Sequence, residues 1–94
     1  VYLSGLVGSD LDAGVAGQTQ QILDRIDELL AAAGSDKSKL LKANIWLSDI
    51  GTWSEMNEVW TKWVVAGSTP ARATVEAALA RPNILVEIMV EAAC

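Results

Sequence analysis

The chain contains no histidine and a single cysteine, Cys94, and together these exclude several kinds of active site. Without histidine, neither a Ser-His nor a Cys-His nucleophile pair can form. Zinc sites are usually built from histidine and cysteine, so we expect no zinc site. One cysteine cannot form an internal disulfide, and we therefore expect a reducing, cytoplasmic setting.

Basic residues are also few, and no hydrophobic run is long. Seven Lys and Arg stand against twelve Asp and Glu, which gives a formal net charge of −5. Nucleic-acid-binding proteins usually carry a basic stripe, so we expect no nucleic-acid partner. No apolar run approaches the roughly 20 residues that span a bilayer, so we expect no membrane partner. Asp10 and Asp12 lack the remaining ligands of a calcium loop, and we expect no metal there.

Hydrophobic residues are plentiful, at 51% of the 94-residue chain. A chain of this length forms one domain and buries roughly 60–65% of its unfolded surface. We expect the remaining apolar surface to lie in a contact between subunits. The segment 1–7 is typical of the middle of a strand region, so we also expect an N-terminal segment to precede it.

Hydrophobic periodicity predicts six elements in the order β-α-β-α-β-β. The predicted strands are 1–7, 43–48, 71–79 and 85–92, and the predicted helices are 18–33 and 53–65. Gly34 suits the positive φ that often ends a helix, and Thr52 with Glu55 fits a capping box. The order predicts an α+β fold: a mixed sheet with parallel crossovers, two helices on one face and a hairpin of the last two strands.

Strand alternation predicts that the sheet face away from the helices is chemically mixed. This face would carry Trp46, Arg72, Thr74, Glu76, Leu85, Glu87, Met89 and Glu91. Its apolar members need cover, whereas its charged members need partners or water. A neighbouring subunit would meet both needs and leave a polar cleft. Such a cleft suits a small carboxylate, because a guanidinium donates two parallel hydrogen bonds to it.

Six short segments, taken in order, resemble the RidA/YjgF family, which older usage calls endoribonuclease L-PSP. They are Leu3-Ser4-Gly5, Gln18-Thr19, Ala33-Gly34, Met56-Asn57, Pro70-Ala71-Arg72 and Val86-Glu87-Ile88. No segment is specific alone, but their order and spacing cover nearly the whole chain. The stretch 57–64, followed by Gly67 and Pro-Ala-Arg, is most similar to a bacterial branch that retains the arginine.

The resemblance implies a chorismate-mutase-like two-layer fold, a single RidA-like domain over 1–94 and a homotrimer with clefts at its subunit interfaces. It implies the activity of a 2-iminobutanoate/2-iminopropanoate deaminase, without a cofactor or a metal. Such a hydrolase converts reactive enamines and imines, such as 2-aminoacrylate, to 2-keto acids and ammonia. The expected ligands are small 2-imino or 2-keto acids.

The same resemblance implies roles for five residues. Arg72 would bind the substrate carboxylate, and Glu87 would position or activate the attacking water. The backbone of Gly5 would contact the amino or imino group, and Asn57 would line the cleft. Thr74 stands where many family members have a cysteine that is not a required nucleophile, so it would alter the pocket without abolishing the reaction.

Three other functions stay open at this point. A non-catalytic small-carboxylate-binding or regulatory trimer would use the same arginine cleft without turnover. A ribonuclease is disfavoured by the acidic charge and the lack of histidine. A purely structural trimer would bind no 2-keto acid. The helically spaced Trp53, Trp60 and Trp63 are interpreted as packing residues rather than as a stacking platform for a ligand.

Overall fold

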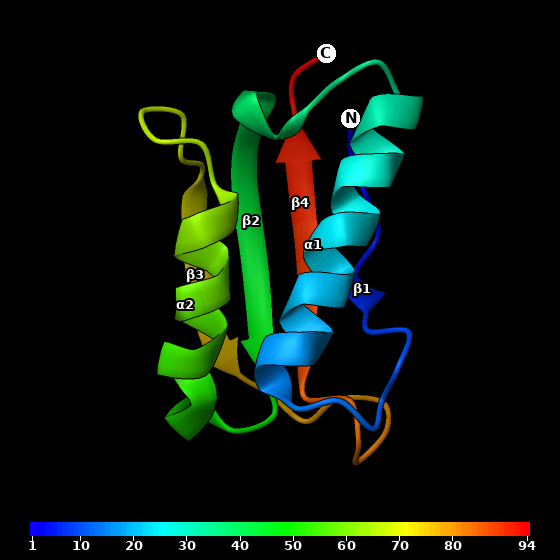
Figure 1. Ribbon diagram of the computed structural model, residues 1–94, viewed down its shortest axis with the longest axis vertical. Helices are drawn as coiled ribbons and strands as arrows, with labels where there is room; N and C mark the ends of the chain where they lie inside the picture. Colours follow the sequence, from blue (N-terminus) through cyan, green and yellow to red (C-terminus); the bar gives the residue numbers. More distant parts are fainter.

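The computed structural model describes residues 1–94 as two layers, a four-stranded sheet with two helices side by side on one face (Figure 1). The strands are β1 (Leu6–Val7), β2 (Leu40–Leu47), β3 (Ala71–Glu76) and β4 (Val86–Ala92). The helices are α1 (Val15–Ala32) and α2 (Trp53–Trp63), with short 3-10 turns η1 (Lys37–Lys39) and η2 (Ile50–Thr52). The predicted α+β class, the element order and the placement of both helices on one face are confirmed.

The strands lie in the order β1-β4-β2-β3. The neighbours β2 and β3 are parallel, and α2 connects them, whereas β4 runs antiparallel to both β1 and β2. The expected hairpin of the last two strands is therefore wrong. Strand β3 ends at Glu76 rather than at Leu79, and the long connection 77–85 carries the chain past the end of β2 to its other side.

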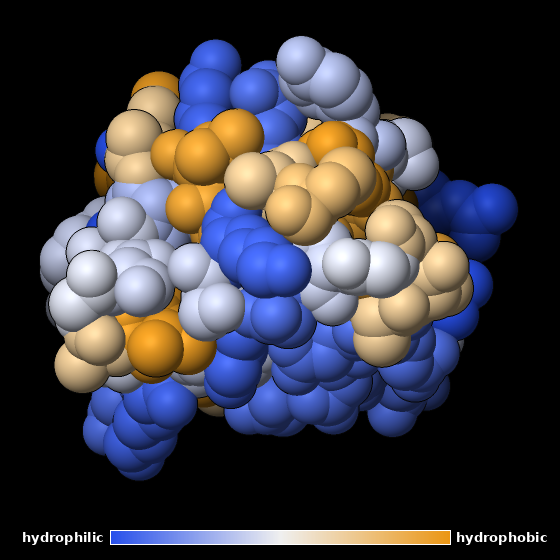
Figure 2. Space-filling model, turned by 90° about the horizontal axis from the view of Figure 1, so that it is seen from above, coloured by the Kyte–Doolittle hydropathy of each residue, from blue (hydrophilic) through white to orange (hydrophobic).

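The core lies between the sheet and the helices. Alternate side chains of the two central strands point into it, and each helix contributes its apolar stripe. The buried members are Ala43, Ile45 and Leu47 of β2, Val86, Ile88 and Val90 of β4, Ile22, Leu23, Ile26 and Leu30 of α1, and Met56, Trp60 and Trp63 of α2. Seen from above, the helix side forms the lower part of the view and is mostly hydrophilic, while hydrophobic patches appear on the upper side (Figure 2). Neither helix is long and apolar enough to cross a membrane.

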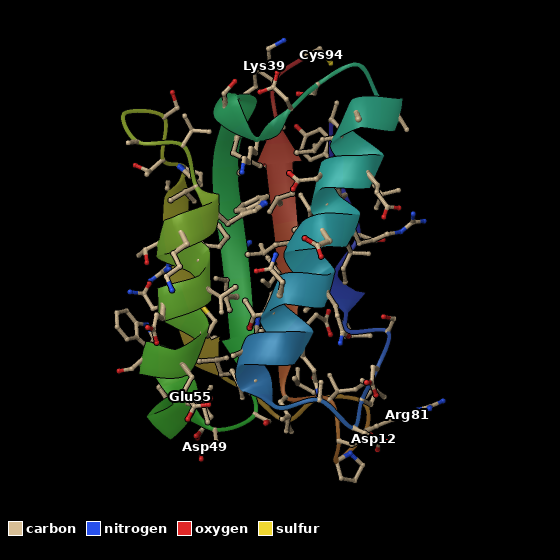
Figure 3. All side chains as sticks on the ribbon, in the orientation of Figure 1. Asp12, Lys39, Asp49, Glu55, Arg81 and Cys94 are labelled. Atoms are coloured by element: carbon tan, nitrogen blue, oxygen red, sulfur yellow. The ribbon has the colours of Figure 1, made fainter.

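The ends of the two helices are determined by different local interactions. Gly34 has φ +78°, as expected for the residue that ends α1. The expected capping box at α2 is wrong, because the Thr52 hydroxyl donates to the Asp49 carbonyl at 2.6 Å instead. The Asp49 carboxylate accepts from the Gly51 N–H at 2.8 Å, so it caps the turn η2 that precedes the helix. Figure 3 shows Asp49 and Glu55 together at this end of α2.

A fully buried glutamine, Gln18, joins α1 to two loops. Its Nε2 donates to the carbonyls of Ala13 at 2.9 Å and Asn83 at 3.0 Å. Its Oε1 accepts from the backbone N–H of Leu85 at 3.0 Å. One side chain thus satisfies three backbone groups and holds the 77–85 connection against the start of α1.

We expect Gln18→Leu to lower the free energy of unfolding by about 3 kcal/mol or more, because it leaves three backbone groups without their partner and each unpaired polar group in the interior costs about 1–3 kcal/mol. Urea unfolding would measure the change. Gln20→Leu is the control, because Gln20 is exposed and bonds only to Asp24 on the same helix. Equal effects of the two substitutions would contradict a special role for Gln18.

Candidate functional site

The residues predicted to form the site lie on two different faces of the sheet. Arg72 pairs in register with Ala43, and Thr74 pairs with Ile45. Partners in a parallel ladder point to the same face, and Ala43 and Ile45 point toward the helices. Arg72 and Thr74 therefore lie on the helix side.

The prediction that placed Arg72, Thr74 and Glu76 on the open face with Glu87 is wrong. It assumed that the apolar alternate residues of β3 would face the core. Strand β3 is an edge strand, however, and its Val75 is 48% exposed. Glu76 also lies on the helix side, where its carboxylate accepts from the backbone N–H of Ile50 at 3.0 Å.

Arg72, Asn57 and Thr74 form what we call the arginine group. The guanidinium Nη1 of Arg72 donates to the Asn57 side-chain oxygen at 2.8 Å. Burial lowers the pKa of Arg72, but an arginine in a protein stays protonated. The structure contains one salt bridge, Arg25–Glu28, so no carboxylate neutralises Arg72. A fixed positive charge with free N–H donors suits a carboxylate ligand.

Thr74 adds a second polar atom on the same side of β3. Its hydroxyl oxygen is buried and has no hydrogen-bond partner within the chain. Because Thr74 follows Arg72 by two residues, both side chains leave the strand on one face. An unpaired buried hydroxyl costs free energy, and it is free to bond to a ligand or a water beside the arginine.

Gly5 and Glu87 form a second cluster, the glutamate group, at the other edge of the sheet. Glu87 pairs with Trp46 on one side and Val7 on the other, and this row lies on the open face. A Cβ placed on Gly5 would lie 2.2 Å from the Glu87 Oε2, so the carboxylate rests against the Gly5 backbone. Glycine is the residue that permits this approach.

The structure thus brings Gly5 to Glu87, and Asn57 to Arg72, but it does not bring the two groups together within one chain. Two grooves lie elsewhere on the surface. One, of about 390 Å³, lies between the helices and includes Glu58 and Lys62. The other, of about 410 Å³, lies between β1 and α1. The predicted site residues line neither groove. No group of three or more histidine, cysteine, aspartate or glutamate side chains is arranged to hold a metal.

The surroundings of the arginine were not predicted from the sequence. The Arg72 Cζ lies 5.6 Å from the ring centroid of Trp53 and 5.4 Å from that of Trp60. Both tryptophans were interpreted as packing residues of α2. Their spacing with Asn57 at positions 53, 57 and 60 was the available signal, because such positions share one helix face.

Comparison with known proteins gives a consistent result. The model of the family described as endoribonuclease L-PSP matches residues 1–94. A RutC family protein of Haemophilus influenzae is 48% identical over 94 residues, which covers 99% of this chain and 81% of that protein. A Bos taurus protein named 2-iminobutanoate/2-iminopropanoate deaminase is 36% identical over 94 residues, covering 94% of this chain and 68% of that protein.

The solved structures agree with these sequence matches. A crystal structure of a YjgF family member from Neisseria meningitidis superposes with a TM-score of 0.92 at 52% identity. The match covers 97% of this chain and 76% of that one. The similarity thus extends over the whole two-layer fold described above, including the strands that carry both residue groups.

Proposed function

This chain belongs to the endoribonuclease L-PSP family, also called YjgF/RidA, and on that premise we propose that it is a cofactor-free hydrolase of reactive enamines and imines. The products are 2-keto acids and ammonia. The observation that carries the proposal is the un-neutralised Arg72, held by Asn57 on the helix side of β3. The name of the bovine relative supports the same reaction class.

We further propose that the working unit is a cytoplasmic homotrimer. Arg72 and Glu87 lie on opposite faces of one sheet, so a site that uses both needs a second copy of the chain. The open face offers apolar area for that contact, with Val7 40% and Val75 48% exposed. In this arrangement the arginine group of one subunit meets the glutamate group of its neighbour across an interface cleft.

The proposed chemistry follows from these two groups. An enamine first tautomerises to the imine, and water then adds to the carbon of the C=N bond. Glu87 accepts a proton from that water and delivers it to the imine nitrogen, which gives a carbinolamine. It then accepts the proton of the new hydroxyl and delivers it to the amine nitrogen, so that the C–N bond breaks, ammonia leaves and the C=O bond forms. One carboxylate can relay both protons. Arg72 binds the substrate carboxylate, the Gly5 backbone contacts the amino or imino group, and Asn57 and Thr74 line the cleft.

A coupled deaminase assay tests this function. A pyridoxal-phosphate serine or threonine dehydratase, or an amino-acid oxidase, generates the imine in the cuvette. Keto-acid formation is then followed with and without the protein, over a panel of amino acids. We expect the protein to accelerate the final hydrolysis, and the panel ranks the side chains that it accepts.

Other outcomes distinguish the remaining functions. Binding of 2-keto acids without acceleration would replace the enzyme by a carboxylate-binding or regulatory trimer. No ligand-dependent rise in Tm with any 2-keto acid would favour a purely structural trimer. The net charge of −5 and the lack of histidine give no support to a ribonuclease; RNA binding that weakens with salt would revive it.

A further inference from the structure

Three side chains from one face of α2 surround the guanidinium of Arg72. Trp53, Asn57 and Trp60 are separated by four and three residues, which places them on one stripe of the helix. Arg72 reaches this stripe from β3, a strand that follows α2 in sequence. Asn57 accepts a hydrogen bond from Nη1 at 2.8 Å, and the two indole rings lie within 5.6 Å of Cζ.

The tryptophan pair, Trp53 and Trp60, stabilises the cation in a way that a carboxylate could not. An aromatic face attracts a guanidinium without accepting its hydrogen bonds. A guanidinium has five N–H donors, and the chain uses one of them, for Asn57. The remaining donors stay free for a ligand. A glutamate in place of either ring would occupy those donors and compete with a ligand carboxylate.

The two tryptophans differ in what else they do. Trp60 is 5% exposed and belongs to the hydrophobic core, where it also packs on Trp63 with centroids 5.4 Å apart. Trp53 is 39% exposed and is not part of the core. Core packing therefore explains why a tryptophan stands at position 60. It does not explain the tryptophan at position 53, the first residue of α2. The contact of Trp53 with Arg72 explains the second one.

We propose that Trp53 is a positioning residue, which together with Trp60 holds the Arg72 guanidinium in the orientation that receives a carboxylate. The inference rests on the proposed function for the identity of the ligand. A free arginine side chain loses rotamer freedom when it binds, and a side chain that is already held loses less. Removing Trp53 should therefore weaken carboxylate binding while leaving the proton relay at Glu87 unchanged.

The test compares Trp53→Ala and Trp53→Phe with Ile50→Ala in the full chain. Ile50 is the control because it is 45% exposed and lies in the turn next to α2. Two readouts are used: the Nε–H signal of Arg72 in an NMR spectrum, assigned by its loss in Arg72→Lys, and the Kd for 2-oxobutanoate. Ring currents are expected to move the wild-type signal away from those of the exposed Arg25 and Arg81.

We expect Trp53→Ala to shift the Arg72 signal toward the exposed arginines and to raise the Kd and KM about 3- to 10-fold, with little change in kcat. Trp53→Phe should restore most of the shift of the Arg72 signal and most of the affinity for 2-oxobutanoate. Ile50→Ala should change neither the signal nor the affinity. A Kd unchanged in Trp53→Ala, or raised equally in Ile50→Ala, would overturn the proposal. If the wild type binds no 2-keto acid, the proposed function fails; an unshifted wild-type Arg72 signal overturns the positioning role by itself.

Discussion

Arg72→Ala is expected to lower kcat/KM by at least about 30-fold, because truncating one partner of a desolvated charge pair costs about 2–5 kcal/mol, and each 1.4 kcal/mol is about tenfold. The cation lies beside two indole rings with no carboxylate to neutralise it, so an anionic ligand has no competitor within the chain. The loss should fall mainly on KM and on the Kd for 2-keto acids. The coupled assay and a ligand titration measure it.

Arg72→Lys is the informative companion substitution. Lysine keeps the charge but not the planar fork, so we expect it to recover only part of the affinity. Arg72→Ala should change Tm little, since the side chain is half-buried and its one hydrogen bond goes to Asn57. An unchanged kcat/KM in Arg72→Ala, with the fold intact, would remove Arg72 from the site.

Glu87→Gln is expected to lower kcat about 100-fold or more while leaving 2-keto acid binding nearly unchanged. The amide keeps the shape of the carboxylate but cannot accept a proton, and general acid–base catalysis contributes about 10²–10⁴-fold. Glu91→Gln is the matched control, because Glu91 lies on the same strand and the same face, four residues further on. Equal losses in both variants would indicate a general charge effect rather than proton transfer.

The Arg72→Ala and Glu87→Gln variants should regain activity when the two chains are co-expressed and assemble together. Each proposed site takes an arginine from one chain and a glutamate from its neighbour. In an equal mixture, half of the chains supply an intact arginine and half an intact glutamate, so about one quarter of the sites are complete. A site built within one chain would give no recovery, and that result would contradict the shared cleft.

Much of this architecture was predictable from periodicity alone. The hydrophobic alternation in β2 and β4 and the apolar stripe on α1 are clear in the sequence, because one face of each element is buried in the core. Gly34 has the positive φ expected of it. The structure places Gly5 against Glu87, and the roles of these two residues toward a substrate stay predictions.

The position of β4 and the orientation of β3 were not predictable in the same way. The five residues 80–84 between the two predicted strands do not reveal whether the last strand returns beside the previous one or crosses to the other side of β2. In β3 the alternation is Ala-Arg-Ala-Thr-Val-Glu, and at an edge both of its faces are partly exposed. Period two determines which residues share a face but not which face is buried. Arg72 was therefore assigned to the wrong side.

The environment of Arg72 was hidden for a related reason. A tryptophan at apolar spacing in a helix gives the same pattern whether it packs on a leucine or on a guanidinium. The register of β3 against β2, which the sequence does not reveal, turns Arg72 toward α2. Once that register is known, the exposure of Trp53 distinguishes it from the buried Trp60 on the same stripe.

The placement of Arg72 and Glu87 on opposite faces of the sheet also has a consequence for gene dosage. If the two groups meet only between copies, an isolated chain is inert, and the output of each molecule depends on how many others are present. At concentrations where trimers dissociate, the assembled fraction falls with the square of the total concentration. Halving expression would then remove far more than half of the activity. In a cell that makes little of the protein, the activity would rise steeply once its concentration is high enough for trimers to form.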